Sequence, residues 1–267
     1  MRGSGPANLD KIHPVVYQTI SVTTGVLTRS SGVRGARNEC AMSKEVLAEQ
    51  IATRLRRDIL RGHLPPGVSI KERDIANEMG VSRTPIREAV RILAQDSLVE
   101  LRPSRSPIVT ISNHIEVGEQ TVVLIELEKL SARLACRHAT DRQLEEMGHL
   151  VREIADNYDT GDPVEVFELD MAFHTAIAEA SGNRSLAETH RAFLMRLWRA
   201  RYLAAEARRE GTRIVDEHFT IHSALSNRDE AAAEAAVTRH LWRLAEDVRE
   251  LVEKDAEAQT ATGMPQV

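Results

Sequence analysis

Apolar residues recur at every fourth position in the stretch that follows Ser43. These positions are Leu47, Ile51, Leu55 and Ile59. Because an α-helix turns by 100° per residue, the four side chains form a stripe along one helix face. Ser43 is a favourable N-cap and Gly62 a favourable stop, so we expect an amphipathic helix between them.

Two shorter helices and a hairpin are expected next. The first of these helices covers residues 71–79 and ends at Gly80, and the next one begins after its N-cap, Ser82. Pro85 is tolerated there because it falls in the first turn. Residues 98–111, LVELRPSRSPIVTI, have the pattern of two short strands around a turn. Three helices followed by a hairpin predict a winged helix-turn-helix domain.

Arginines follow one another at intervals of four on the third predicted helix, at Arg83, Arg87 and Arg91. They centre about 110° away from the apolar stripe of that helix, so they lie beside the buried face. Such a helix enters the major groove, about 12 Å wide, where guanidinium groups suit phosphates and guanine edges. The alternative is a plain solvated face; the spacing, the cap and the preceding helix favour DNA.

The chain beyond Asn113 is expected to be almost entirely helical. Six segments show helical periodicity or start and stop signals: residues 116–136, a helix opened by the capping box Thr140–Gln143, and residues 163–182, 185–209, 214–225 and 229–254. Short connections between helices are typical of a bundle. The predicted fold class is mainly α: an N-terminal winged helix-turn-helix and a C-terminal all-α bundle of six helices.

These patterns divide the chain into four parts. Residues 1–42 are rich in Gly, Ser and Thr, show no sustained period, and are expected to be a flexible extension. Residues 43–112 form the winged helix-turn-helix domain and residues 113–254 the helical domain. Residues 255–267 are expected to be a flexible tail.

Composition narrows the classes of protein to which the chain can belong. Aromatic residues make up only 3% of the sequence, which favours helices packed through Leu, Ile, Val and Ala. The two cysteines, Cys40 and Cys136, make no disulfide framework and indicate a reducing cytoplasm. No apolar run approaches the roughly 20 residues of a membrane span, so no membrane partner is expected.

Charge is distributed unevenly along a chain whose formal net charge is −5. Residues 1–42 and residues 43–112 each have a net charge of +3, and the remainder has −11. A basic N-terminal third on an acidic body suggests a polyanionic partner for that third alone. Solvated charged faces are the alternative explanation of the same count.

Several motifs carry a resemblance to a known family. The stretch GVSRTPIREAVRIL at residues 80–93 closely resembles the DNA-binding domain of the GntR family of bacterial transcription regulators. The helical part resembles the FCD effector domain of the FadR-like subfamily, through LEKLSARLA (127–135), DMAFHTAIAEASGN (170–183), DEHFTIHSAL (216–225) and RHL (239–241). The resemblance covers about residues 43–254.

This resemblance implies a homodimer that binds a short palindromic operator in double-stranded DNA, usually as a repressor. It also implies that a small-molecule effector, often a carboxylic or sugar acid, releases the DNA. Residues 113–254 would then be the effector-binding and dimerisation domain. The segment 112–114 is the expected hinge between the two domains.

The resemblance places DNA contacts at Arg73 on the second helix and at the start of the third helix, at Ser82, Arg83, Thr84 and Arg87. Arg83 and Arg87 are the best candidates for bidentate guanine contacts, each contributing about 1–3 kcal/mol of discrimination. Ser82 and Thr84 suit phosphate, because they lie at a helix N-terminus.

Two positions depart from the family pattern in this domain. Ser106 stands where a glycine usually follows the basic wing residue, which leaves the DNA contact of Arg105 less defined. Ser97 stands where a glycine often ends the third helix. Asp96 or Ser97 must therefore adopt the left-handed conformation, at a modest cost.

Four residues of the helical domain have the composition of a metal site. Asp170 and His174 are one helical turn apart, and His218 and His240 lie on two later helices that a bundle can bring near them. Helix-face histidines are more often surface or core groups, but the metal-binding FCD subgroup has this pattern. We expect a divalent ion, zinc first, with nickel or manganese as alternatives.

Other histidines are expected to lie outside this site. His190 is interpreted as a surface residue, and His222, one turn after His218, as a surface residue rather than a neighbour in the cavity.

The effector itself is not specified by the sequence. Many relatives carry an arginine three residues before the Leu-Glu pair of the first effector helix, where this chain has Leu124. Either Arg133 or Arg196 replaces that cation, or the effector is a more apolar acid. A cavity lined by Val123, Leu127 and Phe173 would fit the second idea, although these residues are equally compatible with a plain core.

Sequence motifs favour a regulator over an enzyme. No motif such as H-E-x-x-H marks a hydrolytic centre, so we interpret the metal as a structural and ligand-binding element. Two alternatives are a metalloenzyme that uses the Asp/3-His site and a repressor that responds to the metal itself.

Overall fold

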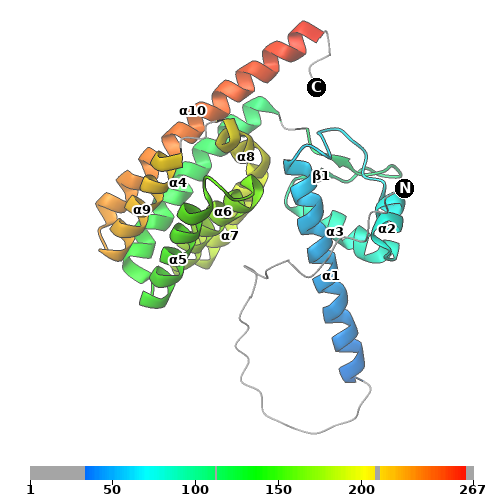
Figure 1. Ribbon diagram of the computed structural model, residues 1–267, viewed down its shortest axis with the longest axis horizontal. Helices are drawn as coiled ribbons and strands as arrows, with labels where there is room; N and C mark the ends of the chain where they lie inside the picture. The colour runs from blue at the N-terminus through cyan, green and yellow to red at the C-terminus, as the bar shows by residue number, and fades with distance from the viewer. Residues whose placement is uncertain (1–33, 112, 208–210, 263–267) are drawn as a thin grey trace.

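The computed structural model describes residues 34–111, 113–207 and 211–262, which form ten α-helices and two β-strands (Figure 1). The helices are α1 Arg34–Leu60, α2 Glu72–Met79, α3 Arg83–Gln95, α4 His114–His138, α5 Asp141–Asn157, α6 Pro163–Ala180, α7 Arg184–Arg196, α8 Trp198–Ala207, α9 Gly211–Ser226 and α10 Glu230–Thr262. The strands are β1 Val99–Glu100 and β2 Ile108–Val109. The predicted class, a winged helix-turn-helix followed by a helical bundle, is confirmed.

The N-terminal domain consists of α1–α3 and the hairpin. Its strands are antiparallel, with Val99 opposite Val109, and Ser69 forms a further bridge to Ile108. Gly80 ends α2 in the left-handed conformation at φ 66°, as expected. The apolar stripes of α1 and α3 pack against each other, and both are almost fully buried.

The first helix starts earlier than the sequence pattern suggested. α1 begins at Arg34, so Ser43 lies inside the helix instead of capping it, and residues 34–42 do not belong to an irregular extension. Ala, Arg, Glu and Met are good helix formers, and a helix extends easily through such residues once it is nucleated. Helix α10 continues to Thr262, so residues 255–262 are helical and the expected tail is wrong there. Residues 1–33, 112 (part of the expected hinge), 208–210 and 263–267 lie outside the described part of the chain.

The helical domain contains seven helices in its described residues, where six were expected. The segment 185–209 is divided at Leu197, whose φ of −91° and ψ of 1° lie in the bridge region. This turn directs Trp198 and Tyr202 edge-on to the ring of Phe167, at centroid distances of 5.3 and 5.4 Å. The sequence has neither glycine nor proline at this position. We attribute the break to the packing of Trp198 and Tyr202 on Phe167.

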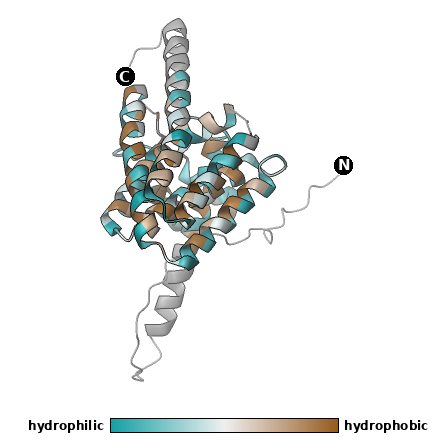
Figure 2. Cartoon of the chain, turned by 90° about the vertical axis from the view of Figure 1, so that its left-hand side faces the viewer, coloured by the Kyte–Doolittle hydropathy of each residue, from teal (hydrophilic) through white to brown (hydrophobic). Residues whose placement is uncertain are grey.

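The helix starts at Thr140 and Asp162 are confirmed, whereas Ser82 occupies the N-cap position of α3 without a side-chain capping hydrogen bond. Thr140 and Gln143 form the predicted capping box at the start of α5. In Figure 2 the bundle helices carry both apolar and polar residues along their length, as amphipathic helices do. Among the residues that the structure describes, no helix has both the length and the apolarity that a membrane crossing requires.

The two domains contact each other through α1. Arg57 forms a two-pronged ion pair with Glu168 of α6, at 2.6 and 3.0 Å, and Arg61 binds Asp162, the N-cap of α6, at 2.8 Å. Arg56 lies 6.0 Å from the ring of Trp198 on α8. Helix α6 is therefore held by the N-terminal domain along its N-terminal half.

Ser97 offers a direct test of how α3 ends. It adopts φ 60°, and the bonds from Ser97 N–H to Ala94 O and from Leu98 N–H to Leu93 O make a Schellman motif. We expect Ser97→Gly to raise the free energy of unfolding by about 0.5–1 kcal/mol, because glycine adopts this conformation without a Cβ penalty. Denaturant titration measures the change. Ala94→Gly, inside the helix, should instead lower stability by about 1 kcal/mol; a loss for both variants would contradict this account.

Candidate functional site

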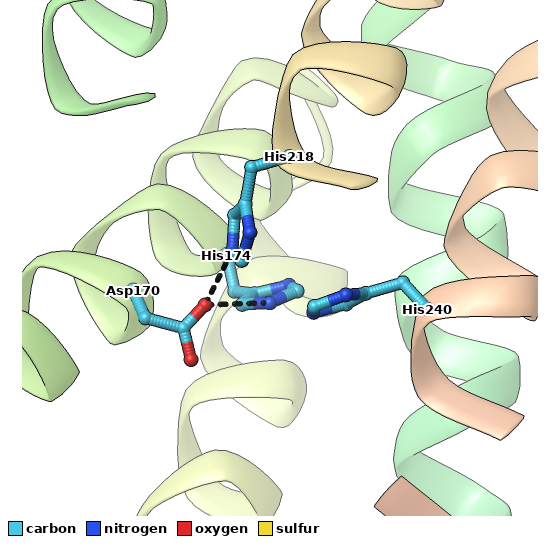
Figure 3. Close-up of side chains that lie close together, drawn as sticks. All are labelled: Asp170, His174, His218 and His240. Carbon is cyan, nitrogen blue, oxygen red and sulfur yellow. Dashed lines mark hydrogen bonds and ion pairs between the residues drawn. The ribbon is translucent and has the colours of Figure 1, made fainter. Parts of the chain in front are cut away.

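The four predicted metal ligands lie together in the middle of the bundle (Figure 3). Asp170 and His174 project from one face of α6, His218 comes from α9 and His240 from α10. One donor atom from each residue lies within 4.8 Å of all the others. The carboxylate Oδ1 of Asp170 is 2.6 Å from His218 Nε2 and 3.3 Å from His174 Nε2.

The second nitrogen of each histidine ring has a partner outside the cluster. His174 Nδ1 is 2.5 Å from Glu128 Oε2, and His240 Nδ1 is 3.0 Å from Glu217 Oε2. His218 Nδ1 is 2.7 Å from the carbonyl oxygen of Ile214. The Nε2 atoms are thereby left for the cluster. The contact at Nδ1 is a hydrogen bond for His218 and His240 and an ion pair for His174. In histidines that bind metals, such a partner at Nδ1 fixes the tautomer and the ring orientation.

The ionisable groups of the cluster perturb one another. Burial opposes the charge of Asp170, but His174 and His218 outweigh it and hold the pKa of the carboxyl well below its usual range. Burial also opposes the charge of His174, yet Glu128 and Asp170 raise its pKa to about 9. Burial, together with the neighbouring histidines, lowers the pKa of His240 to about 4. A divalent cation at the Nε2 atoms would replace the proton that the cluster otherwise holds.

Glu128 of α4 links three helices behind the cluster. Besides His174 it contacts Arg201 of α8, whose Nη1 is 3.0 Å from Oε1, and His190 of α7, whose Nε2 is 3.4 Å from Oε1. Burial would raise the pKa of Glu128, but His174, His190 and Arg201 hold it well below the usual range. The interpretation of His190 as a surface residue is wrong: it is fully buried, because it helps to compensate this carboxylate.

A cavity of about 120 Å³ opens beside the cluster. Asp170, His218 and His240 form part of its wall, together with the arginines Arg201 and Arg213. The apolar part of the wall consists of Ile154, Pro163, Val166, Phe167, Ala204, Ala205 and Ile214, with Tyr158 and Tyr202 beside them.

The residues suggested for the cavity from sequence do not line it. Val123 is 42% exposed, and Phe173 is buried in the bundle core. These two residues and Leu127 are not part of the cavity wall. Arg133 pairs with Glu234, and Arg196 lies over the ring of Phe193. The arginines that line this cavity are instead Arg201 and Arg213, and Arg201 belongs to α8, the helix that follows the break at Leu197.

His222 does not join the cluster. Its Nε2 contacts the carbonyl oxygen of Leu144 at 2.9 Å, and its ring packs against Gly148 of α5. It is half-buried between α9 and α5, and it is not part of the cavity wall.

The predicted DNA-contacting residues are exposed on the N-terminal domain. The side chains of Arg83 and Arg87 are 61% and 55% exposed, and both guanidinium groups lie 3.8 Å from Glu72 of α2. Ser82, Thr84 and Arg73 are exposed near them. Contact of these residues with DNA stays a prediction.

Two further arginines of the N-terminal domain, Arg105 in the wing and Arg91 on α3, lie in different surroundings. Arg105 is exposed in the turn of the hairpin, where Ser104 adopts the left-handed conformation at φ 58°. Arg91, the third arginine of the row, binds Glu88 at 2.6 Å.

Sequence reasoning did not single out Glu128, Arg201, Arg213 or Glu217. For Arg201 and Glu128 the sequence did contain a signal, namely a charged residue at a helical position that the apolar pattern predicts to be buried. Arg201 lies three residues after the buried Trp198, and Glu128 lies one turn from the buried Leu124. The partners of these charges come from other helices, which periodicity does not reveal.

Comparison with known proteins gives the same assignment for both domains. Residues 47–109 match the bacterial regulatory proteins of the gntR family, and residues 120–243 match the FCD domain. The chain is 29% identical to the HTH-type transcriptional repressor RspR of Escherichia coli, over 78% of this chain and 92% of that protein. It is 31% identical to an uncharacterised HTH-type transcriptional regulator in an unstable DNA locus of Streptomyces ambofaciens, over 75% and 84%.

Among solved structures, E. coli McbR/YncC is similar with a TM-score of 0.66 and 21% identity, over 77% of this chain and 98% of that one, which shows the shared fold. The chain therefore belongs to the GntR family of bacterial regulatory proteins with an FCD domain, and it is a DNA-binding transcription regulator rather than an enzyme.

Proposed function

We propose that this regulator is a homodimeric repressor that a small carboxylic acid controls, and that the acid binds beside a divalent metal ion held by Asp170, His174, His218 and His240. The observation that carries the proposal is the cavity: its wall includes three of the four ligand residues and two arginines. Zinc is the preferred ion, because three imidazole nitrogens and one carboxylate oxygen suit it, with nickel or manganese as alternatives.

The charges around the cavity support binding of a metal ion first and of an acidic ligand beside it. Four carboxylates line the wall against two guanidinium groups: Asp170, Glu206, Glu217 and Asp247 against Arg201 and Arg213. A divalent cation offsets this excess of negative charge and makes an acidic ligand acceptable. The apolar remainder of the wall favours an acid with an apolar body.

The contact between the domains supports control of DNA binding by the cavity. Helix α6 supplies Asp170 and His174 to the cluster, and its Asp162 and Glu168 bind Arg61 and Arg57 of α1. A ligand that prefers one position of α6 therefore favours one orientation of the DNA-binding domain. In a dimer the two recognition helices would reach successive major grooves of a palindromic operator, in the bacterial cytoplasm.

The DNA face can be tested at Arg83. We expect Arg83→Ala to weaken binding to an operator selected from genomic fragments by about 5- to 150-fold, because a bidentate guanine contact is lost. Binding to random DNA of equal length should weaken much less. Fluorescence anisotropy at fixed salt measures both. Arg91→Ala is the control, since Arg91 binds Glu88, and equal losses on both DNAs would exclude Arg83 from base readout.

The metal site can be tested at His218. We expect His218→Ala to lose most of its zinc after dialysis, because one of four ligands is removed. His222→Ala, on the same helix, should retain it, because His222 contacts Leu144 instead of the cluster. Metal analysis by mass spectrometry gives the stoichiometry, and unchanged zinc in His218→Ala would remove that residue from the site.

The effector can be sought with small carboxylic acids. On zinc-loaded protein, an acid that binds the folded state raises the melting temperature. We expect the same acid to release the operator, and to do neither on protein stripped of metal. If zinc alone changes operator affinity and no acid adds to it, the chain responds to the metal instead.

A further inference from the structure

Two chains of ion pairs and hydrogen bonds connect the arginines of the cavity wall to the metal cluster. In the first, Arg201 Nη1 is 3.0 Å from Glu128 Oε1, and the other oxygen, Oε2, is 2.5 Å from His174 Nδ1. In the second, Arg213 Nη1 is 2.7 Å from Glu217 Oε1, and Oε2 is 3.0 Å from His240 Nδ1.

Each glutamate thus divides its two oxygens in the same way. One oxygen faces a guanidinium group that lines the cavity, and the other faces the outer nitrogen of a cluster histidine. The third histidine, His218, lacks such a connection at Nδ1, because that nitrogen faces the carbonyl oxygen of Ile214.

We propose that Glu128 and Glu217 are positioning residues for the metal-binding histidines, and that Arg201 and Arg213 weaken this action until an acid binds them. The consequence is that metal and acid tighten each other's binding. This inference rests on the proposed metal site and adds a function for four residues around it.

The physical reason is the competition for charge on each glutamate. A carboxylate at Nδ1 makes the opposite nitrogen of the imidazole a better metal ligand. A guanidinium on the same carboxylate neutralises part of its charge, and Arg201 also opposes the cation directly, because its Nη2 is 3.9 Å from Asp170 Oδ2.

An acid in the cavity reverses this effect. Its carboxylate pairs with the guanidinium group of the arginine and offsets part of that positive charge. The glutamate then keeps more of its negative charge for its contact with histidine Nδ1, and the opposite nitrogen binds the metal more strongly. Since coupling between two binding free energies is reciprocal, the metal must then favour the acid by the same factor.

Zinc affinity in the absence of any acid tests the arginines and the glutamates separately. We expect Glu128→Gln and Glu217→Gln to lower zinc affinity by about 10- to 100-fold, as loss of an outer hydrogen-bond partner does. Arg201→Gln and Arg213→Gln should raise it, on the order of tenfold, because a nearby positive charge is removed. Competition against a chromophoric chelator measures the dissociation constants.

Opposite signs distinguish this proposal from a merely structural role, which would lower affinity in every variant. Arg201→Lys and Arg213→Lys keep the charge and should stay near the wild-type value. Arg133→Gln is the matched control, since Arg133 on α4 pairs with Glu234 away from the cluster. If Arg201→Gln does not fold, Arg213→Gln decides the result, because its side chain is 27% exposed.

The outcomes separate the two proposals. A wild-type chain that binds no zinc overturns the metal site and the coupling together. Zinc binding with weakened or unchanged affinity in a folded arginine-to-glutamine variant overturns the coupling, and it leaves the metal site in place.

Discussion

A buried negative charge determines how this bundle is assembled. Glu128 is 3% exposed, and an isolated carboxylate in an apolar interior is strongly unfavourable. Its partners come from three other helices: His174 from α6, His190 from α7 and Arg201 from α8. Satisfying this one group therefore fixes the positions of those helices around α4, and the cavity and the four-residue cluster lie in the space that they define. Removing one of these partners would leave part of the charge uncompensated, which is costlier than losing an apolar contact.

Aromatic side chains, although few, join the two domains. Phe167, Trp198 and Tyr202 pack edge to face, and this group belongs to the same apolar core as Ile51, Leu93 and other residues of the DNA-binding domain. Charged pairs surround this packing on α1 and α6. A chain whose aromatic content is only 3% thus places three of these residues at the junction, where their large side chains contribute much buried apolar area.

Features with a local cause were predictable from the sequence, and features that depend on neighbouring helices were not. The left-handed end of α3, the capping box of α5 and the shared face of Asp170 and His174 follow from a few consecutive residues. The break at Leu197 does not, because it arises from packing of Trp198 on a distant helix. For the same reason Arg201 and Arg213 could not be placed at the cavity from sequence: periodicity tells which face of a helix is buried, but not which helix lies opposite.

Helix α6 contacts the DNA-binding domain and also supplies two residues of the cluster, and this restricts which of its positions can change in relatives of this protein. Asp162 and Glu168 hold α1, and Asp170 and His174 belong to the cluster, so these positions tolerate little variation. Val166, which lies between Asp162 and Glu168 in the sequence, lines the cavity and takes part in neither the ion pairs nor the cluster. After gene duplication, a change of side-chain volume at this one position could give a daughter protein a new ligand while both inherited tasks persist.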